Sequence, residues 1–126
     1  IGENNKLMGE VMEVNGEECD VKVETGEIIK SLAVNIPGVG GKTTLSLRPE
    51  RVTIKPEEGQ CPNNVQGEVK ELIYLGDHIR ARLALCGQDE FIVKVPNSST
   101  HTQLKEGEIV NVGWLSSDCR ALDAQA

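Results

Sequence analysis

Short stretches in which apolar and polar residues alternate run along almost the whole chain. The clearest covers residues 78–86, where Ile79, Ala81, Leu83 and Leu85 would share one face. A period of two predicts half-buried β-strands, because successive side chains of a strand point to opposite faces. Gly, Pro, Asn and Asp interrupt the alternation roughly every 8–12 residues, and no useful length of sequence has the helical period. The pattern predicts an all-β protein of about ten short strands, folded as a sandwich or barrel.

The two halves of the chain carry the same succession of patterns. GEVME at residues 9–13 recurs as GEVKE at 67–71, and GKTTLSL at 41–47 matches GEIVNVG at 107–113. Repetition of this kind indicates two copies of one strand-rich unit. The alternative is that short strands share composition and look alike without being repeats.

A polar segment with proline, glycine and no periodic apolar residue separates the copies. We therefore predict a first β-rich half at residues 1–56, a linker at 57–64 and a second half at 65–126. Neither half is long enough to close a good core alone, so we expect the two to pack as one unit.

The net charge of the chain argues against a nucleic-acid partner. The chain carries a formal charge of −7, with 11 acidic against 7 basic residues in 1–60 and 9 against 6 in 61–126. Nucleic-acid binders present a basic surface to phosphates, so no nucleic-acid partner is expected. Arg80 and Arg82 could form a small basic stripe on one strand, but the chain has only three aromatic residues to stack on bases. We interpret this stripe as a solvated face.

A glycine-rich stretch, IPGVGGKTT at residues 36–44, ends like a phosphate-binding loop. The Walker pattern requires a glycine five residues before the Gly of Gly-Lys-Thr, and Ile36 occupies that position. The residues that follow alternate with period two as far as Pro49, whereas a phosphate loop leads into a helix whose N-terminus faces the phosphates. We expect a turn that starts a strand, and no nucleotide site.

No group of residues has the spacing of a catalytic or metal site. The four cysteines lie 25 to 42 residues apart, which is too far for a zinc ribbon, and we expect them to be reduced and structural. His78 and His101, with Asp77, Asp118 and Cys119, leave a catalytic Cys–His pair open, against the alternative of exposed polar residues. The prediction is that the chain holds no catalytic, cofactor-binding or metal-binding residue.

The sequence resembles a known family from residue 45 onward. LSLRPERV at residues 45–52 is similar to an L-x-x-R-P-E segment in the C-terminal domains of ATP-binding subunits of ABC importers. Further similar segments follow the family's order: IGENN at 1–5, GEV at 67–69 with YLGD at 74–77, and LKEGEIV at 104–110 with its later tryptophan. The matching family positions, all structural, are Arg48, Pro49, Glu50, Gly67, Gly76, Asp77, Gly107 and Trp114.

The resemblance implies a TOBE domain, which is an OB-fold-like barrel built from two similar half-units. The chain starts at Ile1, not Met, and we expect it to be part of a longer protein. ATP and Mg²⁺ would bind upstream in that parent, and this part would be non-catalytic. Its expected partners are a second copy of the ATPase subunit, its own nucleotide-binding domain and the transporter's membrane subunits, on the cytoplasmic side of the inner membrane. The most similar group is the spermidine/putrescine importers.

Two expectations about sites follow from the resemblance and from proline chemistry. In molybdate-type relatives a similar fold binds the oxyanion, and GKTT at 41–44 and SST at 98–100 are the candidate loops here.

Pro49 fixes φ and stops a strand. Arg48 and Glu50 are expected to tie that corner by charge-assisted hydrogen bonds to each other or to backbone groups, so that Arg48→Ala would destabilise the domain.

Overall fold

The computed structural model describes residues 4–36, 38–96 and 104–123. These residues form strands joined by tight turns, with two three-residue 3₁₀ helices and no longer helix among them. The elements in chain order are β1 (Asn5–Asn15), β2 (Glu18–Val23), β3 (Ile28–Ala33), β4 (Lys42–Leu47), η1 (Pro49–Arg51), β5 (Thr53–Ile54), β6 (Asn63–Leu75), β7 (His78–Leu85), β8 (Gln88–Pro96), β9 (Ile109–Trp114), η2 (Ser116–Asp118) and β10 (Cys119–Asp123).

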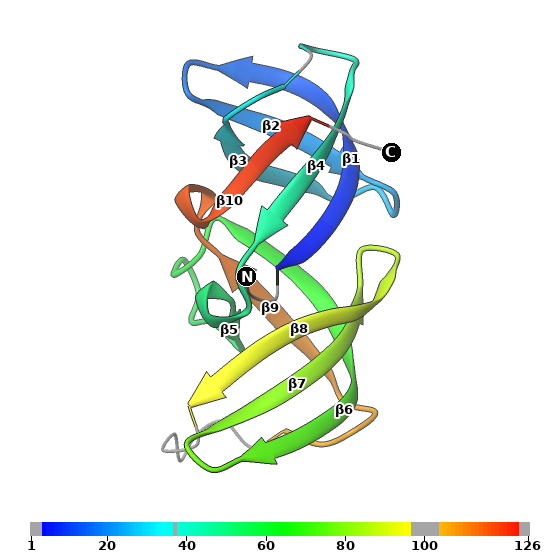
Figure 1. Cartoon of the computed structure of the whole chain (residues 1–126), viewed down its shortest axis with the longest axis vertical. Helices are drawn as coiled ribbons and strands as arrows, with labels where there is room; N and C mark the ends of the chain where they lie inside the picture. The colour runs from blue at the N-terminus through cyan, green and yellow to red at the C-terminus, as the bar shows by residue number, and fades with distance from the viewer. Residues whose placement is uncertain (1–3, 37, 97–103, 124–126) are drawn as a thin grey trace.

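The strands form two sheets that are stacked along the long axis of the molecule (Figure 1). The first is a closed barrel in the order β1-β2-β3-β10-β4, and the second is a five-stranded sheet in the order β5-β9-β6-β7-β8. All pairs are antiparallel except β10 with β3. The predicted all-β, OB-fold-like architecture is therefore confirmed. No described helix is long and apolar enough to cross a membrane.

Each copy of the internal repeat consists of four strands, a 3₁₀ turn and a fifth strand, and each sheet takes its first four strands from one copy. Val11 and Val69 hold equivalent places: Gly40 donates its backbone N–H to the carbonyl of Val11, and Gly107 does the same to Val69. The strand pairing also shifts by one residue just after each of these valines, as in a β-bulge. The structure aligns Gly40 with Gly107, one residue away from the alignment predicted from sequence.

The fifth strand of each copy crosses to the other sheet. β5 pairs with β9 in the second sheet, whereas β10 lies between β3 and β4 and closes the first barrel. The boundaries predicted at residues 56 and 65 therefore differ from the strand pairing, because period-two alternation reports a strand and not its neighbour. β5 has only two residues and pairs with β9 alone, so the second sheet stays open.

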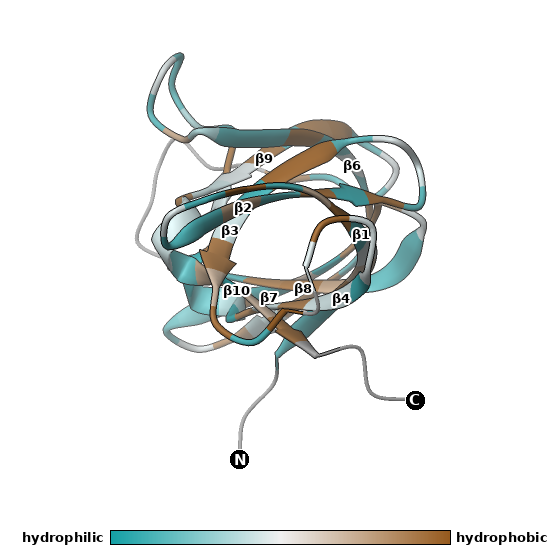
Figure 2. Cartoon of the chain, turned by 90° about the horizontal axis from the view of Figure 1, so that it is seen from above, coloured by the Kyte–Doolittle hydropathy of each residue, from teal (hydrophilic) through white to brown (hydrophobic). Residues whose placement is uncertain are grey.

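A single hydrophobic core runs through both units. The predicted inward row on β7 is confirmed, with Ala81 and Leu83 fully buried. Viewed along the long axis, the strands of both units surround one common centre (Figure 2). Phe91 and Trp114 both belong to the core and stack with ring centroids 5.8 Å apart. A shared core of this kind makes each unit depend on the other for burial of its apolar surface.

Candidate functional site

Two buried asparagines join the units. The side-chain amide of Asn5 donates to the carbonyl of Ile92 at 2.7 Å and accepts from the Ile92 N–H at 2.8 Å. Asn63 repeats this arrangement with Lys30, at 2.8 Å and 2.7 Å. Each asparagine begins the first strand of one unit and pairs with the third strand of the other, so the junction has approximate twofold symmetry.

Asparagine suits these positions because its amide carries the same donor and acceptor as a peptide group. It therefore completes the hydrogen bonding of a buried strand backbone in the way a neighbouring strand would. Sequence reasoning missed both residues. The signal was present, because Asn5-x-Leu7-x-Gly9 and Asn63-x-Val65-x-Gly67 extend the recognised repeat by four residues towards the N-terminus.

A second contact between the units joins two tight turns. The thiol of Cys86 lies 3.8 Å from the Glu27 carboxylate, and Glu24 lies against Gly87. Cys86 and Gly87 both have positive φ, which is typical of a type I′ hairpin turn. Burial, and to a smaller extent the neighbouring Glu27 charge, raise the pKa of Cys86 to about 12. The thiol is therefore neutral at physiological pH.

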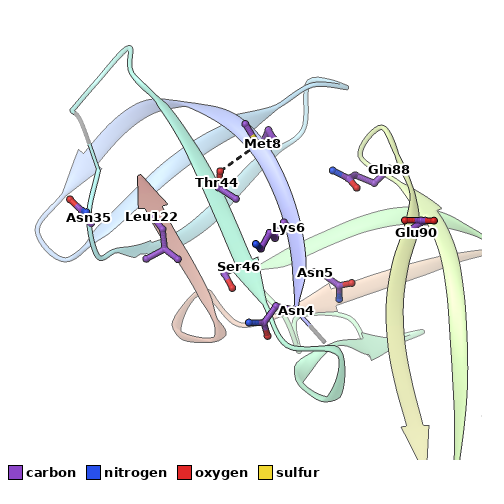
Figure 3. A pocket seen from close by; sticks show the side chains of 10 residues that line it. All are labelled: Asn4, Asn5, Lys6, Met8, Asn35, Thr44, Ser46, Gln88, Glu90 and Leu122. Carbon is purple, nitrogen blue, oxygen red and sulfur yellow. Dashed lines mark hydrogen bonds between the residues drawn. The ribbon is translucent and has the colours of Figure 1, made fainter. Parts of the chain in front are cut away.

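The surface beside this junction carries three adjoining grooves that all border Asn4. Figure 3 shows the first, with Lys6 and Ser46 on β1 and β4 facing Gln88 and Glu90 on β8. The second groove takes in Arg80 and Arg82 of the second unit, and the third takes in residues of the first barrel, such as Arg120. We call this surface the basic face and define it by its six cations: Lys6, Arg48, Arg51, Arg80, Arg82 and Arg120.

The basic face differs in charge from the rest of the molecule. Its grooves contain those six cations and three carboxylates, on Glu71, Glu90 and Asp118, for a formal charge of +3. The remaining residues hold 7 of the 13 basic and 17 of the 20 acidic residues, a formal charge of −10. The ion pairs on the face include Arg82 with Glu71 at 3.5 Å and Arg51 with Asp118 at 4.0 Å. Arg80 and Arg82 thus belong to a larger cationic surface that sequence reasoning did not recognise.

The expected family positions occupy separate places in the fold. Gly67 is packed inside β6, where an added Cβ would lie 3.1 Å from Leu85 Cδ2. Gly76 and Asp77 form the turn between β6 and β7, and Gly107 has a positive φ at the turn before β9. Trp114 is fully buried in the core. These residues do not converge, and each holds a turn or a packing position.

The Arg-Pro-Glu corner differs from its prediction. Pro49 is buried and opens η1, as expected of a proline that ends a strand. Arg48 and Glu50 are exposed, and within the described residues their side chains form neither an ion pair with each other nor a cap on the backbone of η1. The corner is held by the backbone, since the N–H of Arg51 donates to the carbonyl of Arg48 at 3.0 Å. The expectation that Arg48→Ala destabilises the domain therefore loses its structural basis.

The residues weighed for catalysis are not brought together. His78 Nδ1 lies 2.9 Å from Asp77 Oδ1 at an exposed turn, and this contact lowers the pKa of Asp77. Cys119 is buried in the first barrel, and burial raises its pKa to about 12, against a smaller opposing effect of the Trp114 indole N–H. A neutral buried thiol is a poor nucleophile. His101 lies outside the described residues.

The candidate ligand loops also have other roles. Residues 42–47 form β4, as the alternation predicted, and no helix follows Gly41. Thr43 is buried and its hydroxyl donates to the Leu122 carbonyl, so it is committed to the barrel. Residues 98–100 lie outside the described part of the chain. Among the residues the structure describes, no three His, Cys, Asp or Glu side chains are grouped as metal ligands would be.

Comparison with known proteins identifies the class of protein. The TOBE domain pattern matches residues 45–122, and the chain belongs to the TOBE domain family. It is 30% identical over 125 residues to the spermidine/putrescine import ATP-binding protein PotA of Rubrobacter xylanophilus, which covers 97% of this chain and 32% of that protein. PotA of Ruegeria pomeroyi is 29% identical over 90% of the chain and 30% of its own length.

A relative from another transport group and a solved structure complete the comparison. The Fe(3+) ions import ATP-binding protein FbpC 1 of Rhizobium meliloti is 28% identical over 74% of the chain and 25% of its own length. The chain thus spans about a third or less of these relatives. A crystal structure of the cytoplasmic molybdate-binding protein ModG, with molybdate bound, has the same fold, with a TM-score of 0.80 over 94% of this chain and 95% of that one, at 17% identity.

Proposed function

We propose that this chain is the non-catalytic C-terminal assembly and regulatory domain of the ATP-binding subunit of an ABC importer, of the spermidine/putrescine type. The observation that carries the proposal is the similarity of nearly the whole chain to about a third of each of two PotA proteins. The described residues support it by what they build, which is one packed core shared by two units that are joined by structural turns.

In this proposal ATP and Mg²⁺ bind elsewhere in the parent subunit, and the parent hydrolyses ATP. The domain pairs with a second copy of the subunit and contacts its own nucleotide-binding domain. Through the parent it reaches the membrane subunits, from the cytoplasmic side. No partner in this scheme is a nucleic acid.

The test is nucleotide binding by the purified chain and by the full-length subunit. In calorimetry with ATP and Mg²⁺, we expect no saturable heat from the chain and saturable binding by the full-length subunit, which should also hydrolyse ATP. Saturable ATP binding to the 126-residue chain would contradict the proposal.

A second candidate is an oxyanion-binding domain, favoured by the fold shared with ModG along almost the full length of both chains. A thermal-shift screen with molybdate, sulfate and phosphate separates the two functions. A molybdate-specific rise in melting temperature would favour oxyanion binding. Equal melting temperatures with all three anions would favour the assembly domain.

A further inference from the structure

We propose that the basic face docks against a carboxylate-rich surface on the ATP-binding portion of the same subunit, a proposal that rests on the function proposed above. The occupant is thus a protein surface of opposite charge, which the polypeptide itself tethers to the face. Four observations support this proposal: the charge distribution, the cations without partners, the position of Asn4 and the extent of the grooves.

The fold gathers the cations from distant parts of the sequence. Lys6 of β1 lies beside Ser46 of β4, which in turn lies beside Arg120 of β10. Such outward-facing neighbours on adjacent strands are about 5 Å apart at Cβ. The second unit adds Arg80 and Arg82 from β7. A face of +3 on a chain of −7 concentrates positive potential at one surface, which attracts an acidic partner.

Three of these cations have no counter-ion of their own. Lys6, Arg48 and Arg120 are exposed and form no ion pair with the described residues. Like charges close together repel, so their proximity weakens the isolated domain slightly. Arginine presents a planar fork of donors that matches a carboxylate, and the carboxylates of a docked partner would relieve the repulsion.

The position of Asn4 identifies the partner. Asn4 borders all three grooves, so the described chain begins on the basic face (Figure 3). In the proposed parent, the segment before Ile1 leads from this face to the ATP-binding portion. A covalent tether makes docking an intramolecular event with a raised effective concentration, so a modest electrostatic surface is enough for docking.

The extent and chemistry of the face favour a protein surface over other anions. The grooves span both units and include the exposed side chain of Met8, whereas one phosphate group would engage only two or three cations. Single-stranded nucleic acid needs aromatic platforms, and no aromatic residue borders the grooves. Nucleic acid and anionic lipid are therefore outcomes of the test and not the proposal.

The test is zero-length carbodiimide cross-linking of the full-length subunit, which joins a lysine amine to a carboxylate in direct contact. We expect a peptide that links Lys6 to an Asp or Glu of the ATP-binding portion, with a yield that falls between about 20 mM and about 500 mM salt. Lys105, which is exposed and lines none of the three grooves, is the internal control and should give no such link.

Charge reversal tests the assignment to this face. Arg48→Glu with Arg120→Glu should lower the Lys6 cross-link yield about fivefold or more, because both cations become repulsive to carboxylates. The matched control, Lys22→Glu with Lys105→Glu, makes the same charge change away from the face and should leave the yield unchanged. Both variants alter exposed positions, so their melting temperatures should stay close to that of the parent.

Three results would overturn the docking proposal. The first is an absence of Lys6 cross-links at low salt, and the second is an equal Lys6 cross-link yield in the charge-reversed variant and the unmodified subunit. The third is salt-sensitive binding of the 126-residue chain to phosphatidylserine vesicles or single-stranded DNA, if charge reversal abolishes that binding. A full-length subunit that hydrolyses ATP but gives no Lys6 link refutes only the docking. A full-length protein without ATPase activity refutes the proposed function.

Discussion

At the scale of single residues, two buried amides hold the units together. Asn5 and Asn63 are 5% and 2% exposed, and each satisfies both backbone groups of a residue in the opposite unit. A buried peptide group without a partner costs more than the hydrogen bond itself is worth, because it loses its water and gains nothing. These two residues therefore contribute far more to stability than the small area that each side chain buries would suggest.

Substitution of either asparagine should destabilise the whole chain. We expect Asn5→Ala to lower the free energy of unfolding by about 2–4 kcal/mol, because it leaves the buried N–H and C=O of Ile92 unpaired. Asn63→Ala should cost less, about 1–3 kcal/mol, because the N–H and C=O of Lys30 are only partly buried. Denaturant unfolding measures the change. Asn64→Ala, next in sequence but exposed, is the matched control and should cost less than about 0.5 kcal/mol. Equal effects at positions 63 and 64 would contradict the role of the buried amides.

The buried thiols predict sensitivity to alkaline pH. The pKa of Cys119 is about 12 in the folded protein against an ordinary value of 9.0, so the folded state favours the neutral thiol. A raised pKa contributes stability that is fully present below pH 9.0 and is lost as the pH rises toward about 12. Unfolding free energy should fall over this window, by up to about 1.4 kcal/mol per pH unit for this group.

Cys119→Ala tests this assignment, since the variant has no thiol to titrate at position 119. It should be less stable at neutral pH because of the cavity, but its stability should fall less steeply above pH 9.0. Denaturant curves at a series of pH values give both slopes. Parallel slopes for the two proteins would show that another group controls the alkaline transition.

At the scale of elements, a glycine at the same place in each repeat sets how closely two strands approach. An added Cβ at Gly9 of β1 would lie 2.6 Å from the Lys22 carbonyl oxygen, which is part of the paired backbone of β2. At Gly67 of β6 the nearest atom is 3.1 Å away and belongs to the Leu85 side chain. A side chain can change rotamer, whereas a paired backbone cannot move without loss of register.

The two glycines should therefore differ in their tolerance of alanine. We expect Gly9→Ala to cost about 2–4 kcal/mol through displacement of β2, and Gly67→Ala to cost about 1 kcal/mol through repacking of Leu85. Thermal unfolding of both variants ranks them, and each serves as the control for the other. A larger cost at Gly67 would contradict the difference between backbone and side-chain contact.

At the scale of the whole molecule, exchange of the fifth strands makes the two units interdependent. A piece that ends at residue 56 has no strand between β3 and β4, because β10 supplies it from the other end of the sequence. Its buried surface would also lose Phe91 and Trp114, which belong to the common core. We therefore expect one cooperative unfolding transition, as for a single domain.

Fragment complementation measures this dependence. Peptides 1–56 and 57–126 should each be largely unfolded alone, and an equimolar mixture should recover the strand content and the tertiary signal of Trp114. Circular dichroism and tryptophan fluorescence report the two quantities. A cooperative transition in either isolated peptide would show that the halves are independent domains.

Period-two alternation determined the strands, as on β7, because burial of one face imposes that pattern locally on the sequence. The repeat and the strand after Thr44 could be predicted for the same reason, and the end of that strand at Pro49 from the fixed φ of proline. The pairing partners of the strands could not be predicted, because β5 and β10 would have the same local pattern whichever strand they paired with. Only the tertiary structure decided that Asn5 meets Ile92, 87 residues away, and that Lys6, Arg80 and Arg120 share one face of an acidic chain. Long-range pairing and the charge of a surface both depend on residues that are far apart in the sequence, and no local window of sequence contains them.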